Sequence, residues 1–197
     1  MALRRDIELL DVEIVTDRLV LRPISLIDLE PIAREFSEEI TRYMYPPPAQ
    51  SRMDVAPFIA DSLEGLSNNT NLQMVAVSKE DPGSFVGCVG LHKPLTSTPE
   101  IGIWIAKSFH RRGLGLEAIA KSFHRRGLGL EAIEGLCEWA AEQIECDYLR
   151  YPVDRANAHS RRISKSLGGE IEDEYDRITS DGRTLNILEY RNYPETI

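Results

Sequence analysis

Cysteine is scarce in this sequence. The three cysteines, Cys88, Cys137 and Cys146, are odd in number and contain no C-x-x-C pair, which argues against a disulfide framework and against a cysteine zinc site. Cys88 falls in a strand pattern and Cys137 in a helical pattern, so we expect both to be buried small apolar residues. Such cysteine usage predicts a reducing compartment, the cytoplasm.

Long apolar runs and positive net charge are also lacking. No stretch is long and apolar enough to span a membrane, and the first residues lack the apolar run of a signal peptide. The formal net charge of -9 and the pI near 5.0 disfavour nucleic acid as a partner. They favour cationic partners such as amines or basic peptides, although solubility alone also explains them. The four histidines show no metal-ligand spacing, so no metal is expected.

An exact repeat dominates the middle of the chain. Residues 106–119 and 120–133 both read AKSFHRRGLGLEAI, which indicates a recent or engineered tandem duplication and not a solenoid. Each copy holds a basic Gly-rich turn followed by helix formers, and the apolar stretch 100–105 before it predicts a strand. A strand, a Gly-rich turn and a helix N-terminus direct backbone N–H groups at one point, which suits a phosphate or pyrophosphate. The alternative is a tight turn that only caps a helix and binds no anion.

The remaining patterns predict a single α/β domain over residues 1–197, with a mixed sheet of about seven strands and about four helices. The expected strands are 14–22, 71–78, 84–92, 100–106, 148–153, 174–178 and 184–193, and the expected helices are 26–37, 53–66, 130–144 and 157–167. The Tyr-Pro-rich stretch 43–48 cannot continue a helix. It either lines a pocket or covers the core.

This order of elements resembles the GNAT superfamily of acetyl-CoA-dependent N-acetyltransferases. The stretch 16–23, TDRLVLRP, looks like the opening strand of the ribosomal-protein N-terminal acetyltransferase branch. The sequence RRGLG is similar to the family's acyl-CoA pyrophosphate motif, with His110 or His124 where the family has Arg or Gln. The block Asn157-x-x-Ser160, with Leu167 and Gly168 after it, is similar to the next block of that branch.

The resemblance implies transfer of an acetyl group from acetyl-CoA to a primary amine, such as a protein or peptide N-terminus. The Ile105 N–H is then expected to face the thioester carbonyl, and Ser160 to protonate the thiolate. Glu100 is the candidate base, with Glu172 and Glu174 as rivals. The expected cofactor-binding residues are Ile105, His124, Arg125, Arg126, Gly127, Leu128, Gly129 and Asn157.

Only one copy of the repeat can form the pyrophosphate site. We expect copy two to form it and residues 107–120 to be extruded, because a loop insertion costs little closure entropy. The alternative site is copy one, with Arg111, Arg112, Gly113, Leu114 and Gly115. A second alternative is a catalytically impaired GNAT-fold domain that binds CoA or regulates. We expect no nucleic-acid or membrane partner, and either a monomer or a homodimer.

Overall fold

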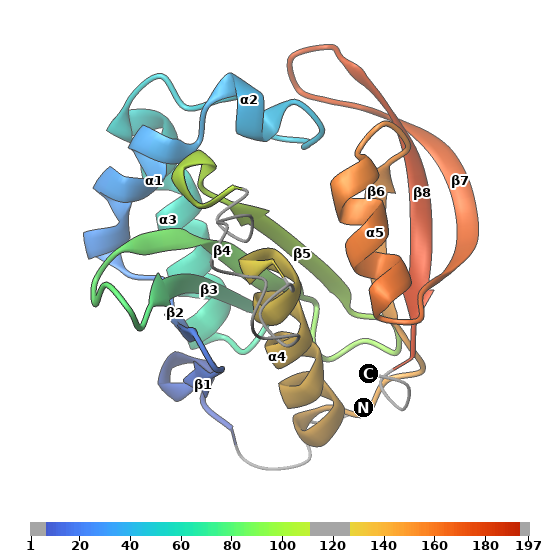
Figure 1. Cartoon of the computed structure of the whole chain (residues 1–197), viewed down its shortest axis with the longest axis horizontal. Helices are drawn as coiled ribbons and strands as arrows, with labels where there is room; N and C mark the ends of the chain where they lie inside the picture. Colours follow the sequence, from blue (N-terminus) through green and yellow to red (C-terminus); the bar gives the residue numbers. More distant parts are fainter. Residues whose placement is uncertain (1–6, 111–126, 194–197) are drawn as a thin grey trace, which may run out of the picture.

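The computed structural model describes residues 7–110 and 127–193 of the chain. In this part of the chain, eight strands form one sheet in the order β1-β2-β3-β4-β5-β6-β8-β7 (Figure 1). The strands are β1 (Ile14–Val15), β2 (Leu19–Pro23), β3 (Asn71–Ser78), β4 (Phe85–His92), β5 (Glu100–Ile105), β6 (Leu149–Asp154), β7 (Glu170–Ile178) and β8 (Thr184–Asn192). Every neighbouring pair is antiparallel except β5 and β6, which are parallel. The expected mixed α/β sheet is confirmed, with one strand more than predicted.

Helices cover both faces of the sheet. The α-helices described are α1 (Leu29–Glu35), α2 (Glu38–Thr41), α3 (Arg52–Ser67), α4 (Leu128–Gln143) and α5 (Ala158–Ser166). Trp104 of β5 packs against Phe36, which ends α1, with ring centroids 5.1 Å apart. Its strand neighbours Ile103 and Ile105 approach Gly129 of α4 instead. Because successive side chains alternate between faces, α1 and α4 lie on opposite faces of β5.

The prediction of one continuous strand over residues 14–22 is wrong, because this stretch forms the β1–β2 hairpin. The Thr16 N–H donates to the Leu19 carbonyl over 3.0 Å. The turn is held from outside by Glu131 of α4, whose carboxylate accepts from the Thr16 hydroxyl at 2.6 Å and from the Arg18 N–H at 2.7 Å. The partner that fixes this turn lies more than 100 residues away, so the local apolar alternation could not reveal it.

Other elements also differ from the prediction at their ends, two of them by several residues. The helix expected from residue 26 starts as a 3₁₀ turn (Leu26–Asp28) and becomes α1 only at Leu29. The last hairpin was expected from residue 174, but β7 already begins at Glu170. Strand β7 is an edge strand with almost every residue exposed, so it shows no apolar alternation to mark its start. After α5 the chain leaves the helix through Gly168, whose φ of 75° is a left-handed conformation that favours glycine.

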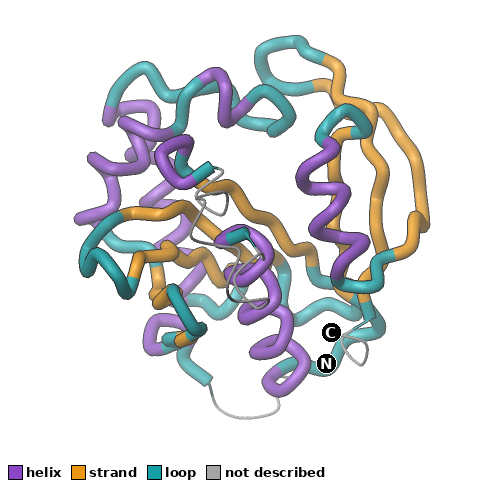
Figure 2. The backbone as a smooth tube through the Cα atoms, viewed as in Figure 1, coloured by secondary structure: helices purple, strands orange, loops and turns teal. Residues whose placement is uncertain are grey.

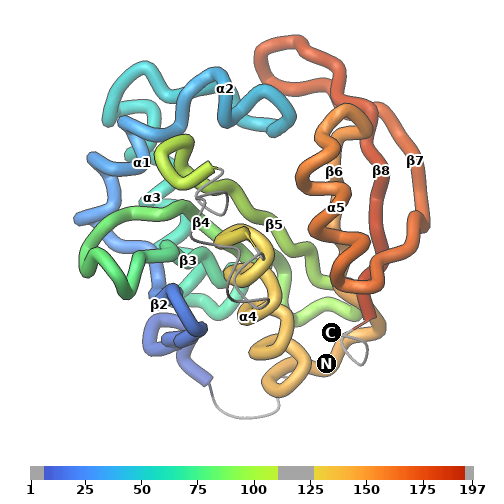
Figure 3. Tube along the Cα trace, in the orientation of Figure 1, coloured from blue at the N-terminus to red at the C-terminus, as the bar shows by residue number. Residues whose placement is uncertain are grey.

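The two parallel strands separate soon after they meet. Only one register pair, Glu100 with Arg150, joins β5 to β6. Beyond this pair the strands diverge, and α5 follows β6 on the far side of the opening (Figure 2). Figure 3 shows that β5 ends the N-terminal part of the sheet, while β6, β8 and β7 form the C-terminal part. The gap therefore lies between the two parts of the sheet.

Candidate active site

A cavity of about 700 Å³ lies where β5 and β6 diverge. Its walls come from the end of α1, the 43–50 loop, α3, strands β4, β5, β6 and β8, and the start of α5. Large apolar side chains such as Trp104, Tyr45 and Phe58 line it together with the polar groups Glu100, His92 and Ser160. An apolar cavity with a few convergent polar groups is the usual form of a small-molecule site.

Two glycines make the floor of this cavity. Gly90 of β4 and Gly102 of β5 are register partners and both line it. A Cβ atom on Gly90 would lie 2.9 Å from the Gln73 side-chain oxygen and 3.2 Å from the His92 ring. A larger residue at position 90 would therefore displace both polar side chains and fill space at the floor.

A polar row crosses the sheet beside these glycines. The register places Asn71, His92, Glu100 and Arg150 opposite one another on β3, β4, β5 and β6. His92 Nδ1 lies 2.8 Å from Asn71 Oδ1, and an Arg150 nitrogen lies 3.7 Å from the Glu100 carboxylate. Glu100, the predicted base, is thus at the cavity wall, between an imidazole and a guanidinium.

Arg150 is held more tightly by Glu189 than by Glu100. Its Nε and Nη2 donate to the two Glu189 carboxylate oxygens at 2.8 and 2.7 Å. This hydrogen bonding raises the pKa of Arg150. The Tyr175 hydroxyl donates to Glu189 at 3.0 Å, and burial together with this hydrogen bond raises the pKa of Tyr175 to about 12. The cation that faces Glu100 is therefore fixed in place and permanently charged.

Ser160, the predicted proton donor, lines the cavity from the first turn of α5. Its N–H donates to the Asn157 side-chain oxygen over 3.1 Å, so Asn157 is the helix cap of α5 and also borders the cavity. The cap fixes where α5 begins, and with it the position of the Ser160 side chain at the wall.

Tyr151 of β6 is an orphan polar group in the cavity wall. Its side chain is 3% exposed, and its hydroxyl is the one buried side-chain oxygen or nitrogen of the described residues that has no hydrogen-bond partner. Burial raises the pKa of Tyr151 to about 12, and the Ser160 side chain, which is near enough to act as a hydrogen-bond partner, lowers it. The two side chains do not meet in hydrogen-bonding geometry, so the hydroxyl is unsatisfied. An unsatisfied buried hydroxyl is costly, so this group fits a site in which a ligand supplies the missing partner.

The N–H of Ile105 points into the gap between β5 and β6. Ala106 donates its N–H to Val86 of β4 over 2.8 Å, and the N–H groups of successive residues point to opposite sides of a strand. The Ile105 N–H therefore points away from β4. On the same side, the Ile105 carbonyl has the His110 Nε2 at 2.8 Å.

The start of α4 is open to an anion. Gly127 is the residue before the helix and supplies no side-chain cap, and Leu128 and Gly129 form the first turn. A Cβ on Gly127 would meet no atom within 4 Å, whereas Gly129 lies close enough to Ile105 that a Cβ would be 3.3 Å from its side chain. The first N–H groups of a helix have no partner within it. The predicted residues 127–129 therefore present N–H groups beside the end of β5.

The other predicted pyrophosphate residues, His124, Arg125 and Arg126, and all five alternatives in copy one, residues 111–115, lie outside the described residues. The prediction that residues 107–120 are extruded, however, needs correction. Lys107–Phe109 form a 3₁₀ turn, Lys107 pairs with Glu39, and Phe109 packs against the core. Copy one thus continues from β5 through His110, and copy two supplies the residues that start α4.

The two rival candidates for the base, Glu172 and Glu174, lie outside the cavity. Glu172 pairs with Arg191 and Glu174 with Arg155, both on the outer strand β7. Neither residue lines the cavity.

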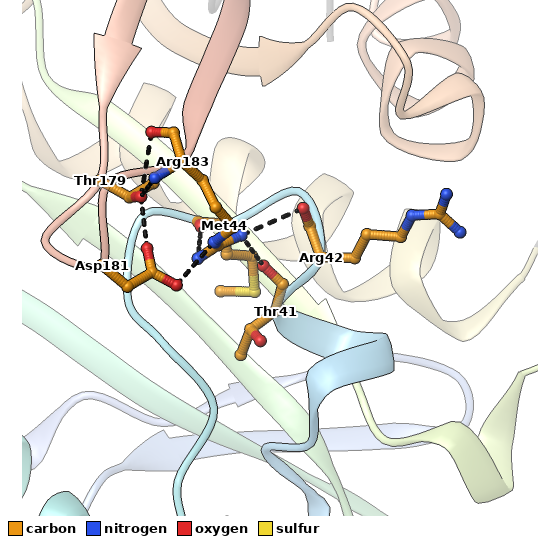
Figure 4. A network of polar contacts seen from close by, with 6 residues as sticks. All are labelled: Thr41, Arg42, Met44, Thr179, Asp181 and Arg183. Atoms are coloured by element: carbon orange, nitrogen blue, oxygen red, sulfur yellow. Dashed lines mark hydrogen bonds and ion pairs between the residues drawn. The ribbon is translucent and has the colours of Figure 1, made fainter.

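A bridge joins two segments that are far apart in the sequence, one of which contributes Met44 to the cavity wall. Arg183, at the tip of the β7–β8 hairpin, donates to the carbonyls of Thr41 at 3.2 Å, Arg42 at 3.3 Å and Met44 at 3.3 Å (Figure 4). Asp181 holds the same guanidinium through its Nε at 2.7 Å. The hairpin tip is thereby fastened to the start of the 43–50 loop. Pattern reasoning predicted this hairpin but not its contact, because the acceptors are backbone carbonyls.

The sequence analysis also missed three cavity residues or their partners, His92, Asn71 and Tyr151. A usable signal existed for the first two. The 79–83 turn joins two strands whose hairpin register brings Asn71 opposite His92. No comparable local signal marks Tyr151, because its environment is made by β6, α4 and α5 together.

Among residues 7–110 and 127–193, no three His, Cys, Asp or Glu side chains are grouped as a metal site. None of the helices in those ranges has the length and apolar character needed to cross a bilayer.

One comparison with known proteins identifies a family. The family model described as "Acetyltransferase (GNAT) domain" matches residues 18–122 and 118–170. The two matches overlap inside the repeat, so together they span most of the chain. No curated protein sequence matches.

Solved structures show the same fold at low identity. A GNAT-family acetyltransferase from Bacillus anthracis is 15% identical with a TM-score of 0.72, over 93% of this chain and 99% of that one. RimJ of Mycobacterium smegmatis, in complex with CoA-disulfide, is 16% identical with a TM-score of 0.70, over 91% and 83%. Spermidine N-acetyltransferase of Vibrio cholerae, in complex with CoA and spermine, is 16% identical with a TM-score of 0.67, over 90% and 96%.

Proposed function

Because the chain belongs to the GNAT acetyltransferase family, whose members use acetyl-CoA, we propose that it acetylates the α-amino group of a peptide or protein N-terminus. The observation that carries this proposal is the gap between β5 and β6. It has the Ile105 N–H on its β5 side, the open start of α4 beside it and Ser160 in the cavity wall.

The residues around the gap have different roles in the reaction. N–H groups of residues 127–129 bind the pyrophosphate of acetyl-CoA, with the Arg125 and Arg126 side chains adding positive charge. Asn157 borders the cavity and keeps α5 in position. The Ile105 N–H donates to the thioester carbonyl as negative charge develops on that oxygen. Ser160 gives a proton to the departing thiolate.

The acceptor amine enters the cavity on the α1 and α3 face. Glu100 and Asp54 line this region and attract an ammonium group. The aromatic side chains Trp104, Tyr45 and Phe58 surround the substrate's first residue, and they favour an N-terminus with an apolar or aromatic side chain. A similar solved structure, described as "a putative ribosomal-protein-serine acetyltransferase from Vibrio cholerae", supports the peptide class, whereas the spermidine acetyltransferase structure supports a polyamine.

A thiol-release assay with acetyl-CoA tests the proposal. Three acceptors are compared: a short peptide with a free N-terminus, the same peptide with a blocked N-terminus and an internal lysine, and spermidine. We expect release with the first peptide only. Release with spermidine alone would contradict the N-terminal acceptor but keep the acetyltransferase.

The exact repeat favours one rival, an impaired domain that binds CoA without turnover, because the surplus residues adjoin the proposed pyrophosphate site. A ligand that binds only the native state raises the melting temperature. A rise in melting temperature with CoA but no thiol release in any assay would support that rival. No rise in melting temperature at millimolar CoA would contradict both the active acetyltransferase and the impaired CoA-binding domain.

A further inference from the structure

Among the described residues, His92 is the one histidine that lines the cavity. It ends β4, directly opposite Glu100 of β5. A Cβ placed on Gly102 would lie 3.7 Å from its Nε2, and one placed on Gly90 would lie 3.3 Å from the same atom. The Nε2 edge of the ring therefore lies over the glycine floor, where there is space for an acceptor amine.

The hydrogen bond on the other side of the ring sets its tautomer. His92 Nδ1 lies 2.8 Å from Asn71 Oδ1, and an amide oxygen can only accept a hydrogen bond. With the Asn71 oxygen facing it, Nδ1 carries the hydrogen, so in the neutral ring Nε2 holds a lone pair. A neutral imidazole with its lone pair facing a cavity can take a proton.

We propose that His92 is the general base of acetyl transfer, with its Nε2 accepting the proton that the acceptor amine loses. This inference rests on the proposed function, because it assumes an amine acceptor. Asn71 is a positioning residue that holds the tautomer. Glu100 faces the ring from β5 and stabilises the imidazolium, so the carboxylate predicted as the base acts through His92.

The atoms balance in this scheme. The amine nitrogen bonds to the thioester carbon and passes one proton to His92 Nε2. The carbon–sulfur bond breaks, and its electron pair leaves on sulfur. The thiolate takes a proton from Ser160, which recovers one from solvent, and His92 returns its proton to solvent. The products are the acetylated amine and the free thiol.

The charges around His92 agree with a base that is neutral near pH 7. Burial lowers the pKa of His92, Glu100 raises it and Lys93 lowers it. The other elements that pack on the ring contribute the neutral Asn71 and Gln73 from β3. Arg150 on β6 stands behind Glu100, and Asp54 of α3 lies across the cavity.

His92→Asn and His92→Gln test the proposal, with Ser160 intact. Asn keeps a donor toward Asn71 and Gln keeps a polar group over the floor, so both preserve the packing while neither can take a proton. We expect kcat to fall on the order of 10²-fold or more, with an unchanged melting-temperature shift on adding CoA. The acid limb of the kcat/KM pH profile, set by His92 in the wild type, should disappear. Wild-type kcat and an unchanged acid limb in His92→Asn would overturn this inference and leave the proposed function standing.

Two variants of Asn71 separate positioning from structure. Asn71→Leu removes the acceptor and should lower kcat. Asn71→Asp keeps the acceptor and adds negative charge, so activity should return with the acid limb moved to higher pH. A merely structural Asn71 would give no such shift, and its absence would count against the proposal.

Nitrogen-15 NMR of the imidazole rings provides a readout that does not need turnover. We expect the hydrogen of neutral His92 on Nδ1, and finding it on Nε2 would overturn the inference. Failure of the proposed function is distinguishable, because the wild-type chain would then release no thiol with any amine, and the inference would fall with it.

Discussion

Glu100 and Arg150 form the single register pair that joins β5 to β6, so the gap opens where the two strands separate beyond this pair. Arg150 is held by two hydrogen bonds to Glu189, so it marks a fixed closed end of the gap. On the open side, the Ile105 N–H points away from β4 and can donate to a carbonyl oxygen. The same pair places a carboxylate next to His92.

Ser160→Ala should lower turnover while leaving CoA binding unchanged. The hydroxyl acts on the thiolate only as the carbon–sulfur bond breaks, so its loss reduces kcat and kcat/KM together. We expect a reduction on the order of 10²-fold in the thiol-release assay. The Asn157 cap uses the Ser160 N–H and not its hydroxyl, so α5 should remain folded. An unchanged rate would remove Ser160 from the donor role.

Gly127→Asp should abolish CoA binding. Position 127 tolerates a side chain, because a Cβ there meets nothing within 4 Å and its φ is -65°. The effect is therefore electrostatic, since a carboxylate would face the pyrophosphate at the start of α4. Gly127→Asn is the matched neutral control and should keep most of the affinity, as measured by the melting-temperature shift with CoA.

Gly113→Asp, the same change in copy one, should be nearly silent. Copy two supplies the start of α4, so the Gly113 position is not the one that precedes the helix. Equal partial losses in the two Asp variants would indicate that both registers are populated, and a loss confined to Gly113→Asp would show that copy one forms the site.

Deleting one copy of the repeat should stabilise the protein. Removing residues 107–120 gives the same sequence as removing any other 14 consecutive residues of the repeat. The connection between His110 and Gly127 then shrinks from 16 residues to two. Each halving of a loop saves about 0.6 kcal/mol in closure entropy, so the free energy of unfolding should rise by about 2 kcal/mol.

Urea unfolding measures that gain, and CoA affinity should become tighter in the same variant. A destabilised deletion variant would show that the surplus residues contribute packing of their own. A variant with unchanged CoA affinity would show that they do not disturb the site.

Arg183→Ala should release the 43–50 loop from the β7–β8 hairpin. The guanidinium donates to three backbone carbonyls, which lose these partners in the variant. We expect the acceptor KM to rise several-fold, with little change in the CoA-induced melting-temperature shift. Arg183→Lys should not restore the wild-type KM, because an ammonium cannot match the planar fork. An unchanged KM in both variants would separate the bridge from acceptor binding.

The sequence determined most of the elements, and with them the family. The strands 71–78 and 100–105 and the two-glycine start of α4 follow from apolar spacing and turn residues, which act over a few neighbours. The family resemblance pointed to Ser160 and Glu100 as site residues, and both line the cavity. The motif could not decide between identical copies, because both have the same local preferences.

Tertiary structure decided what depends on distant partners. Residues 14–22 turn back because Glu131 receives their hydrogen bonds, and His92 becomes a candidate base because the register sets it between Asn71 and Glu100. Tertiary contacts also hold the start of α4 at copy two. In this position Glu131 accepts a hydrogen bond from Thr16, and Gly129 packs against Ile105. Such contacts join residues far apart in the chain, and local propensity carries no information about them.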